Sequence, residues 1–387
     1  MLLKIDSIIL ARPYCIVNVR KLVFTGLNTH KSQNIEKTYK FHIERKALSA
    51  YIVYMKNLKI YFVEGEHKDE KILGKSSEGY LLKEFEGSGC KIVKSPSEID
   101  LSDFPIAVLS LDMPLVTKEY LDRMLKYALK RGISRVVFGS EDNGCFLQVD
   151  SGKGTYFAES LVFLQLGGAK NYNMVYNTLR KRINSRLLKD GVILLGEEFH
   201  IDDTVIVESG ATLISPTTLK GSTIVKSGAT VENSIVIDST IDSDAQVTCS
   251  HLTSSYVGEN TTVGPFARLR EGKVLKNCRI GDFVEVKNSV LQDEVKCAHL
   301  AYVGDAEVGE RTNVGCGSVF CNYDGKNKHR THVGKDVFIG ANVNLVAPLR
   351  IGDGTYIAAG TTVTKDTAEN GFVIGRVRQE NKGTKQK

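Results

Sequence analysis

Nine side chains between residues 265 and 330 are of types that perform acid–base chemistry or bind anions. They are Arg268, Glu285, Lys287, His299, Tyr302, Asn313, Asn322, Tyr323 and Lys328. An imidazole titrates near neutral pH and commonly removes a proton from an amine or a hydroxyl. A carboxylate can orient that ring, and guanidinium and ammonium groups suit a phosphate. Each residue alone is more often a solvated or satisfied group, but together they predict a sugar-phosphate site with an imidazole base.

These residues are far apart along the chain, so a repeating fold must bring them together. Steps of six from Ile201 meet Val207, Leu213, Leu219, Val225, Val231 and Ile237. A second run of the same spacing is Val333, Ile339, Leu345, Ile351, Ile357 and Val363. Because about a quarter of positions are Ile, Leu or Val, seven in fixed register arise by chance about once in ten thousand. A six-residue period suits a solenoid in which three hexapeptides complete one triangular coil.

Glycine often follows the repeated aliphatic residue, as at Gly281, Gly309, Gly315 and Gly340. We expect corners at these positions, where the residue must be free to take unusual backbone dihedrals. The alternative is a β-sandwich, but sandwich strands recur every 8 to 12 residues and seldom in fixed register. The sequence therefore predicts a parallel β-helix over residues 193–366.

The repeat is interrupted between Phe320 and Val333, which are thirteen residues apart. Residues 321–332 are therefore expected to leave the prism as a loop. A polar, lysine-rich loop on a rigid scaffold is a natural place for binding residues, and the alternative is a plain solvated loop.

The first part of the chain has the pattern of a mixed α/β domain, predicted over residues 1–165. Strand-like runs are Tyr51–Met55, Leu58–Val63 and Ile106–Leu111, and helical spacing covers Lys118–Arg131 and Met174–Leu188. The second helix is predicted to be a linker within residues 166–192. A tail is predicted over residues 367–387.

Composition limits the class of protein. A chain of 387 residues with 42% hydrophobic and 25% charged residues forms cores, which excludes disordered and membrane-spanning classes. Eight cysteines without a C-x-x-C pair argue against a zinc site or a secreted disulfide framework, and we expect them reduced and buried. The net charge of +6 suggests anionic ligands, but no dense basic tract indicates nucleic acid. With Lys4 and Asp6 inside the N-terminal apolar stretch, we expect a cytoplasmic protein with no membrane partner.

Five segments carry a resemblance to a known family. They are Gly264–Arg270, Asp282–Lys287, His299–Glu307, Cys321–Gly325 and Ala358–Val363. In order and spacing they resemble the left-handed β-helix acetyltransferase domain of the bacterial bifunctional glucosamine-1-phosphate N-acetyltransferase and N-acetylglucosamine-1-phosphate uridyltransferase. The resemblance spans residues 195 to 378 approximately. It implies transfer of acetyl from acetyl-CoA to the amine of glucosamine 1-phosphate, for cell-wall precursor synthesis, in a homotrimer with sites between subunits.

The resemblance also implies roles for single residues. His299 matches the general base, with Glu285 beside it. The sugar-phosphate positions are matched by Arg268, Lys287, Tyr302, Asn313 and Lys328, and the acetyl-CoA positions by Asn322, Tyr323, Cys316, Ala341, Ala359 and Arg376. Family members usually have Ala where Cys316 stands and Ser where Ala341 stands. We therefore interpret Cys316 as a contributor of backbone atoms and not as a nucleophile.

The N-terminal part departs from the family. The uridyltransferase half has a glycine-rich loop whose amides cradle the nucleotide phosphates, and the segment around Gly26 lacks that signature. Ser110–Leu115 resembles the metal-binding turn, with Asp112 as a vestigial magnesium ligand and Asn171 as its partner. We interpret residues 1–165 as a degenerate nucleotidyltransferase-like domain. Two alternatives stay open, a retained magnesium-dependent uridylyl transfer and a non-catalytic trimeric scaffold or regulatory binding protein.

Overall fold

The computed structural model describes residues 57–94, 96–102, 104–139 and 144–380. The chain forms two compact units, of which the first ends at Val175 and the second begins at Tyr176 and includes Lys71–Lys75. The strand expected at Tyr51–Met55 and the segment around Gly26 lie outside the described residues. In the described part of the chain, no helix is long and apolar enough to cross a membrane.

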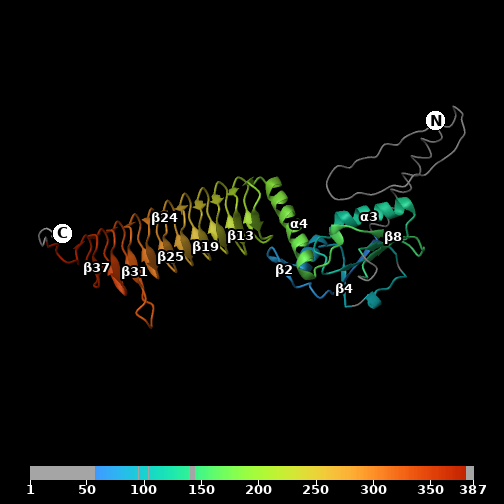
Figure 1. Cartoon of the computed structure of the whole chain (residues 1–387), viewed down its shortest axis with the longest axis horizontal. Coiled ribbons are helices and arrows are strands. Elements are labelled where there is room, and N and C mark those ends of the chain that lie inside the picture. The colour runs from blue at the N-terminus through green and yellow to red at the C-terminus, as the bar shows by residue number, and fades with distance from the viewer. Residues whose placement is uncertain (1–56, 95, 103, 140–143, 381–387) are drawn as a thin grey trace, which may run out of the picture. The chain divides into compact units, whose positions relative to one another are not determined.

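The first unit is built on one mixed sheet of six strands in the order β4-β1-β5-β7-β6-β8. Its strands are β1 (Lys59–Val63), β4 (Lys91–Val93), β5 (Ile106–Ser110), β6 (Arg135–Phe138), β7 (Phe146–Gln148) and β8 (Thr155–Ala158). Strand β7 runs antiparallel to β5 and β6, and the other pairs are parallel. The helices are α2 (Ser77–Glu84) and α3 (Lys118–Arg131), so the predicted helix is confirmed (Figure 1). Helix α3 begins after the Thr117 cap and ends at Gly132, whose φ of 63° is left-handed.

Helix α4 (Gly168–Lys189) starts in the first unit and continues into the second. The predicted helix Met174–Leu188 is thus confirmed and extended. In the second unit, Arg186 of α4 and Lys75 of the short strand β3 (Lys75–Ser76) both form ion pairs with Asp203, which lies in the first rung between β10 and β11. The Tyr176 hydroxyl lies 2.6 Å from Nδ1 of His200. These contacts fix the helix over the open end of the stack that follows.

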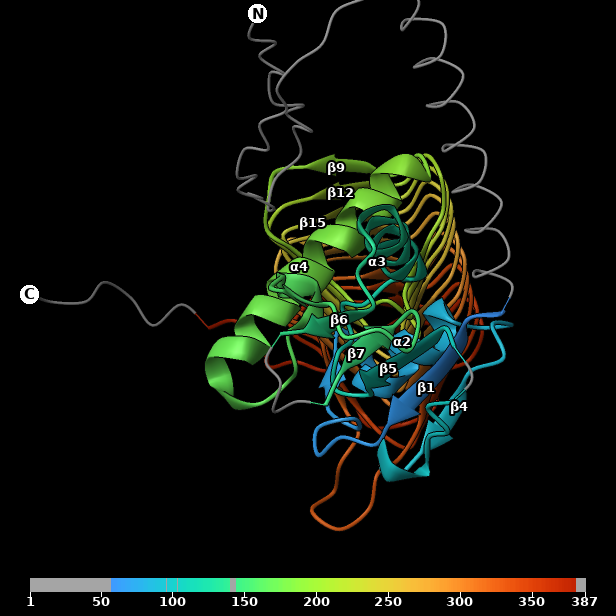
Figure 2. The ribbon, with the colours of Figure 1, turned by 90° about the vertical axis from the view of Figure 1, so that its right-hand side faces the viewer.

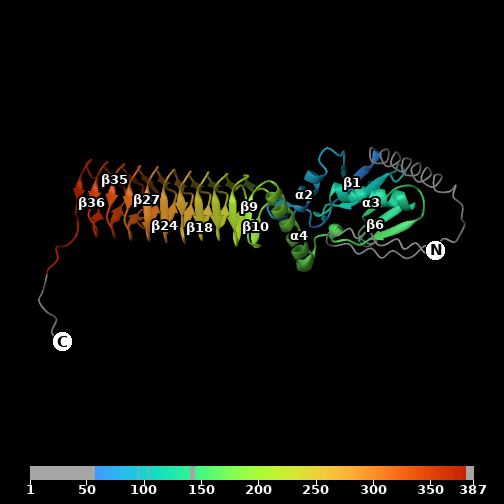
Figure 3. The same cartoon turned by 90° about the horizontal axis from the view of Figure 1, so that it is seen from above.

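The rest of the second unit is a stack of parallel strands in three sheets (Figures 1 and 3). The first sheet holds β10 (Phe199–Ile201), β13 (Thr217–Lys220), β16 (Ile235–Ile237), β19 (His251–Thr253), β22 (Arg268–Arg270), β25 (Glu285–Lys287), β28 (Tyr302–Gly304), β31 (Val319–Cys321), β34 (Asn344–Val346) and β37 (Thr362–Val363). The second sheet holds β11 (Ile206–Val207), β14 (Ile224–Val225), β17 (Thr240–Ile241), β20 (Tyr256–Val257), β23 (Lys273–Val274), β26 (Val290–Leu291), β29 (Ala306–Val308), β32 (Thr331–Val333) and β35 (Leu349–Ile351). The third sheet, seen at β9, β12 and β15 in Figure 2, holds β9 (Ile193–Leu195), β12 (Thr212–Ile214), β15 (Thr230–Glu232), β18 (Gln246–Thr248), β21 (Thr262–Val263), β24 (Arg279–Asp282), β27 (Lys296–His299), β30 (Asn313–Val314), β33 (Phe338–Ile339), β36 (Tyr356–Ile357) and β38 (Phe372–Val373). Each complete rung, from β9–β11 to β33–β35, takes one strand from each sheet, which is the hexapeptide β-helix that the sequence predicts.

The repeated aliphatic residues fill the interior of this prism. Leu213, Leu219, Val225 and Val231 are all fully buried, as the six-residue period predicts. The prediction that Ile237 faces the interior is wrong, because Ile237 is only partly buried and Val236 takes the interior position. The cause is the length of the rung. Strands β10 and β13 pair residues eighteen apart, whereas β13 and β16 pair residues seventeen apart.

Glycine does lie at the corners, but the reason that we expected, unusual backbone dihedrals, is wrong. The backbones of Gly281, Gly309 and Gly315 do not adopt left-handed φ values. A Cβ atom there would lie 2.0 Å from the carbonyl oxygen of Ala298, 2.4 Å from the carbonyl carbon of Gly334 and 2.6 Å from that of Gly340, respectively. Glycine is required at these corners because the backbone of the next rung approaches too closely for a side chain.

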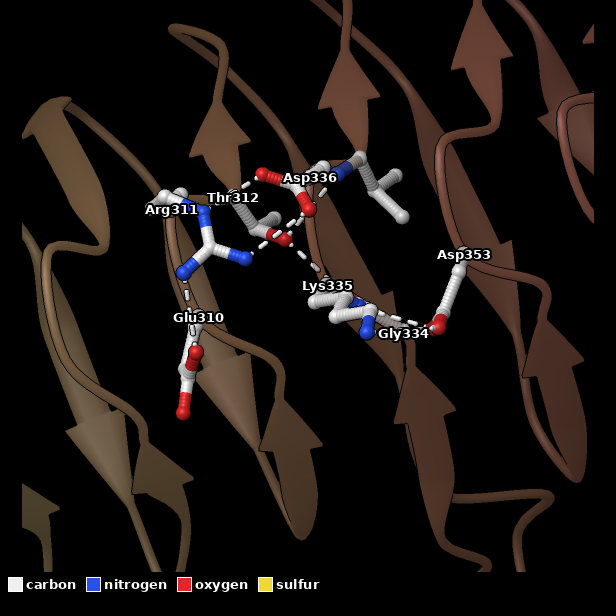
Figure 4. Close-up of polar contacts among 8 residues, drawn as sticks. Glu310, Arg311, Thr312, Gly334, Lys335, Asp336 and Asp353 are labelled. Carbon is white, nitrogen blue, oxygen red and sulfur yellow. Dashed lines mark hydrogen bonds and ion pairs between the residues drawn. The ribbon is translucent and has the colours of Figure 1, made fainter.

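At the corner between the second and the third sheet, polar side chains join neighbouring rungs (Figure 4). Arg311 donates from Nε and Nη2 to the two carboxylate oxygens of Asp336, at 2.7 and 2.9 Å, and from Nη1 to Glu310 at 2.9 Å. On the following rungs, Asp353 accepts a hydrogen bond from the backbone N–H of Lys335 at 3.0 Å. These bonds join neighbouring rungs along the outside of the prism.

Candidate functional site

The parallel register of the first sheet aligns two columns of predicted site residues. Arg268, Glu285 and Tyr302 are successive Cα partners in β22, β25 and β28. Arg270 and Lys287 are partners in the next column. Side chains alternate along a strand, and the residues between these columns are fully buried, so both columns lie on the outer face of the sheet.

Lys287 lies at the edge of this face, next to a carboxylate and a second lysine. Its Nζ atom is 3.6 Å from Oδ2 of Asp305. Lys328 comes from the loop 321–332, and the adjacent ammonium group of Lys287 lowers the pKa of Lys328. Like charges disfavour each other, so an anion bound between the two lysines would relieve that repulsion. The structure thus brings together two of the three cations that the sequence assigns to a phosphate.

Arg270 is a site residue that the sequence reasoning missed. Its Nη2 atom forms an ion pair with Oε1 of Glu285, and its Cα partner is Lys287. The signal was present, because in the sequence Arg268-Leu269-Arg270 a buried leucine between two arginines places both on one face. The outer face therefore carries Arg268, Arg270 and Lys287 together.

His299 lies around the corner from this face. It is exposed at the end of β27 in the third sheet, where its Cα partner is Asp282 of β24. Only Leu300 and Ala301 separate it from Tyr302, the first residue of β28. Among the described residues no hydrogen bond joins His299 to Glu285, so the orienting role of Glu285 stays a prediction.

Four of the six residues that match acetyl-CoA positions, Cys316, Ala341, Ala359 and Arg376, follow one another along the same corner as His299, and Asn322 and Tyr323 lie after β31 at the next corner. The carbonyl oxygen of Cys316 accepts from the N–H of Asn342 at 2.7 Å, and that of Ala341 from the N–H of Gly360 at 2.8 Å. The carbonyl oxygen of Ala359 accepts from Nη1 of Arg376 at 2.8 Å. Cys316 is exposed, which corrects the expectation that the cysteines are buried. Asn313 lies on the same rung as Cys316, in β30.

A loop leaves the prism between β31, which ends at Cys321, and β32, which begins at Thr331, so the predicted loop 321–332 is confirmed with residues 322–330 outside the strands (Figure 1). Asn322 at its base is buried and donates a hydrogen bond from its side-chain amide to Asp305. Tyr323 is exposed, pairs with Lys328 in an antiparallel bridge and donates from its hydroxyl to the carbonyl oxygen of Gly325 at 2.7 Å. The loop is thus a short hairpin closed by its own hydrogen bonds.

In the first unit, Asp112 is the second residue after β5 and is buried. Burial raises the pKa of Asp112, although its carboxylate accepts a hydrogen bond from the backbone N–H of His67 at 3.0 Å. Asn171 donates its amide to the carbonyl oxygen of Gln165 at 3.1 Å. The described residues contain no group of three or more His, Cys, Asp or Glu that could hold a metal ion. The vestigial magnesium role of Asp112 and Asn171 stays a prediction.

Fold and repeat together define a hexapeptide-repeat β-helix domain. Residues 330–365 match the family model "Bacterial transferase hexapeptide (six repeats)", and residues 220–315 match "GlmU-like, C-terminal hexapeptide". The resemblance found in the sequence is confirmed for this half of the chain.

Curated relatives carry the name Bifunctional protein GlmU. The protein of Exiguobacterium sp. strain AT1b is 44% identical over 207 residues, which is 53% of this chain and 46% of the relative. That of Clostridium novyi strain NT is 45% identical over 211 residues, 52% of this chain and 45% of the relative. The chain matches less than half the length of these relatives. Among solved structures, the UDP-N-acetylglucosamine acyltransferase of Francisella novicida has a TM-score of 0.32 at 14% identity. The match covers 44% of this chain and 63% of that chain.

Proposed function

We propose that the chain is a glucosamine-1-phosphate N-acetyltransferase that uses acetyl-CoA, in the cytoplasmic synthesis of cell-wall precursors. The observation that carries the proposal is the parallel register, which gathers Arg268, Arg270 and Lys287 on one outer face, one corner away from His299. Cations gathered on one face suit the phosphate of the sugar. A sugar phosphate bound on this face would then place its amine towards the corner where His299 lies.

The reaction needs a base, because a protonated amine is no nucleophile. His299 takes the proton, and the amine attacks the carbonyl carbon of the thioester, forming a C–N bond. The tetrahedral oxyanion collapses with cleavage of the C–S bond, the nitrogen gives up its second proton and the departing CoA thiolate takes one up, so that the products are the amide, the CoA thiol and the proton held by His299. The chemistry requires no covalent bond to the enzyme.

The oxyanion needs hydrogen-bond donors during this step. At the corner beside His299, the backbone N–H of Gly315 donates to Ile339 at 2.9 Å and that of Gly317 donates to Leu300 at 2.7 Å. These two groups are therefore engaged in holding the rungs together. We assign the backbone N–H of Cys316, which lies between them, as the donor to the oxyanion.

An apolar corner supports the homotrimer. Phe266, Phe283 and Leu300 have φ values of 59°, 58° and 33° and are 58%, 61% and 59% exposed. A left-handed backbone costs such residues roughly 1–2 kcal/mol each. Their exposed side chains also lack the stabilisation that apolar surface gains when it is removed from water. The two phenylalanine rings stack with centroids 5.4 Å apart. A second copy of the chain packed on this corner would bury them and would border His299, the neighbour of Leu300, so that the site forms between subunits.

The test is release of free thiol from acetyl-CoA with glucosamine 1-phosphate as acceptor, run beside glucosamine 6-phosphate and unphosphorylated glucosamine. We expect release that depends on the 1-phosphate. The proposal is contradicted if none of these acceptors receives an acetyl group.

A further inference from the structure

A single buried carboxylate joins the parts of the candidate site that come from different rungs. Asp305 follows β28 and is 6% exposed. One oxygen accepts a hydrogen bond from the side-chain amide of Asn288 on the preceding rung at 2.6 Å. The other accepts from the side-chain amide of Asn322 and lies 3.6 Å from Nζ of Lys287. Both oxygens are thus engaged, and each side-chain partner comes from a neighbouring rung.

The main chain of Asp305 adds a second attachment to the loop 321–332. Its N–H donates to the carbonyl oxygen of Lys287 at 2.9 Å, and its carbonyl oxygen accepts from the N–H of Thr331 at 3.3 Å. Asn322 stands before the exposed part of the loop, residues 323–330, and Thr331 stands after it. One residue therefore holds both ends of the loop.

The surroundings favour the ionised form of Asp305. Burial alone would raise its pKa, but the amides of Asn288 and Asn322 and the ammonium group of Lys287 outweigh burial and lower it. A carboxylate is able to accept from two amides and pair with an ammonium at once. An asparagine could not, because it offers one acceptor oxygen and points an NH₂ group at another donor.

We propose that Asp305 is a positioning residue, which fixes the loop carrying Tyr323 and Lys328 and holds the Lys287 ammonium group in place beside it. Its attachment of the loop stands on the contacts alone, and its effect on catalysis rests on the proposed function. A lysine on a flexible stem and a loop held only by its own turn lose entropy when they bind a phosphate. Anchoring both on one carboxylate removes part of that cost before the ligand arrives.

The test variant is Asp305→Asn in the full-length protein. Asparagine has nearly the shape of aspartate and tolerates the φ of 49° found at this residue. We expect trypsin to cut within residues 326–330 at least tenfold faster, with the cut sites identified by mass spectrometry. We also expect the KM for glucosamine 1-phosphate to rise about tenfold, while kcat changes less than threefold.

Asp238→Asn is the matched control. Asp238 occupies the equivalent corner after β16, has a φ of 47° and accepts a hydrogen bond from the N–H of Ser222 at 2.9 Å, but contacts no candidate site residue. We expect it to leave both the cutting rate and the KM unchanged. Cutting of Asp305→Asn within twofold of wild type would overturn the proposal, as would a loss confined to kcat.

The two proposals fail separately. If the wild type transfers no acetyl group, the proposed function is wrong, yet trypsin still reports whether Asp305 anchors the loop. Should Asp305→Asn not fold, Asn322→Asp places a second carboxylate against Asp305 and is expected to release the loop in the same way. An unchanged cutting rate in that variant also contradicts the anchor.

Discussion

Arg270 and Glu285 form an ion pair between the adjacent strands β22 and β25, on the outer face that also carries Lys287. The pair holds the arginine beside the lysine, its Cα partner in β25. Glu285 in turn is engaged by a cation on its own face, and in the part of the chain that the structure describes no hydrogen bond joins it to His299. This arrangement makes Arg270 the cation whose removal tests the phosphate assignment.

Arg270→Gln is expected to lower kcat/KM for glucosamine 1-phosphate by about 10- to 100-fold, mainly through KM. A hydrogen bond to a charged group contributes about 1.5–3 kcal/mol, and the substitution also leaves Glu285 unpaired near the phosphate. Steady-state kinetics with varied sugar phosphate measures the effect. Arg279→Gln is the control, since Arg279 is an exposed arginine of β24 in the third sheet. Equal KM values for the two variants would remove Arg270 from the site.

His299→Ala is expected to lower kcat by roughly 10²- to 10⁴-fold, the usual loss when a general base is removed. Because the side chain is exposed, the variant should keep the size and the melting temperature of the wild type. His332→Ala is the matched control, since His332 belongs to β32 in the second sheet, where it lies 3.5 Å from Glu307. Turnover near that of the wild type in His299→Ala would show that another group is the base.

Phe283→Asn is expected to shift the assembly towards monomer and to lower activity together with it. Asparagine tolerates the φ of 58° at this position, so the fold of one chain is kept while the apolar surface is removed. Sedimentation velocity at several concentrations measures the state. Ile206→Asn removes an apolar side chain of similar exposure from the second sheet and should leave the size unchanged. A fully trimeric Phe283→Asn variant at low concentration would contradict the assignment of this corner to the interface.

Asp242→Asn is expected to reduce the free energy of unfolding by about 1.5–3 kcal/mol at pH 7, the contribution of a hydrogen bond to a charged group. Although burial acts to raise the pKa of Asp242, the Tyr256 hydroxyl at 2.6 Å and Lys226 at 2.9 Å outweigh it and lower the pKa to about 2. A lowered pKa means that the carboxylate stabilises the fold above its ordinary value of 3.8 and stops doing so as the pH falls through about 2.

Denaturant unfolding between pH 7 and pH 2 tests this sign. The difference between wild type and Asp242→Asn should shrink over the lower part of that range. Tyr256→Phe, which removes one partner and leaves Lys226 and the backbone N–H of Ser243, should show a smaller loss in the same direction. A difference that stays constant down to pH 2 would contradict the role of the charge.

Several elements could be predicted from the sequence because they depend on local periodicity. The aliphatic residue at every sixth position marks the prism interior, and the thirteen-residue gap after Phe320 marks the loop. Helix α3 was predicted with both of its ends from its apolar spacing, and the Thr117 cap and Gly132 in the structure agree with those ends. Residue types alone also indicated an imidazole with nearby cations.

Which of those residues meet was decided by the tertiary structure. Stacked parallel rungs make neighbours of residues about one coil apart, and the coils are not of equal length: β10 and β13 pair residues eighteen apart, and β16 and β19 pair residues sixteen apart. A coil that is one residue longer or shorter pairs a side chain with a different residue of the neighbouring strand. The pairing of Arg270 with Glu285 and the convergence of Asn288, Asn322 and Lys287 on Asp305 therefore follow from the register, which the six-residue pattern leaves open.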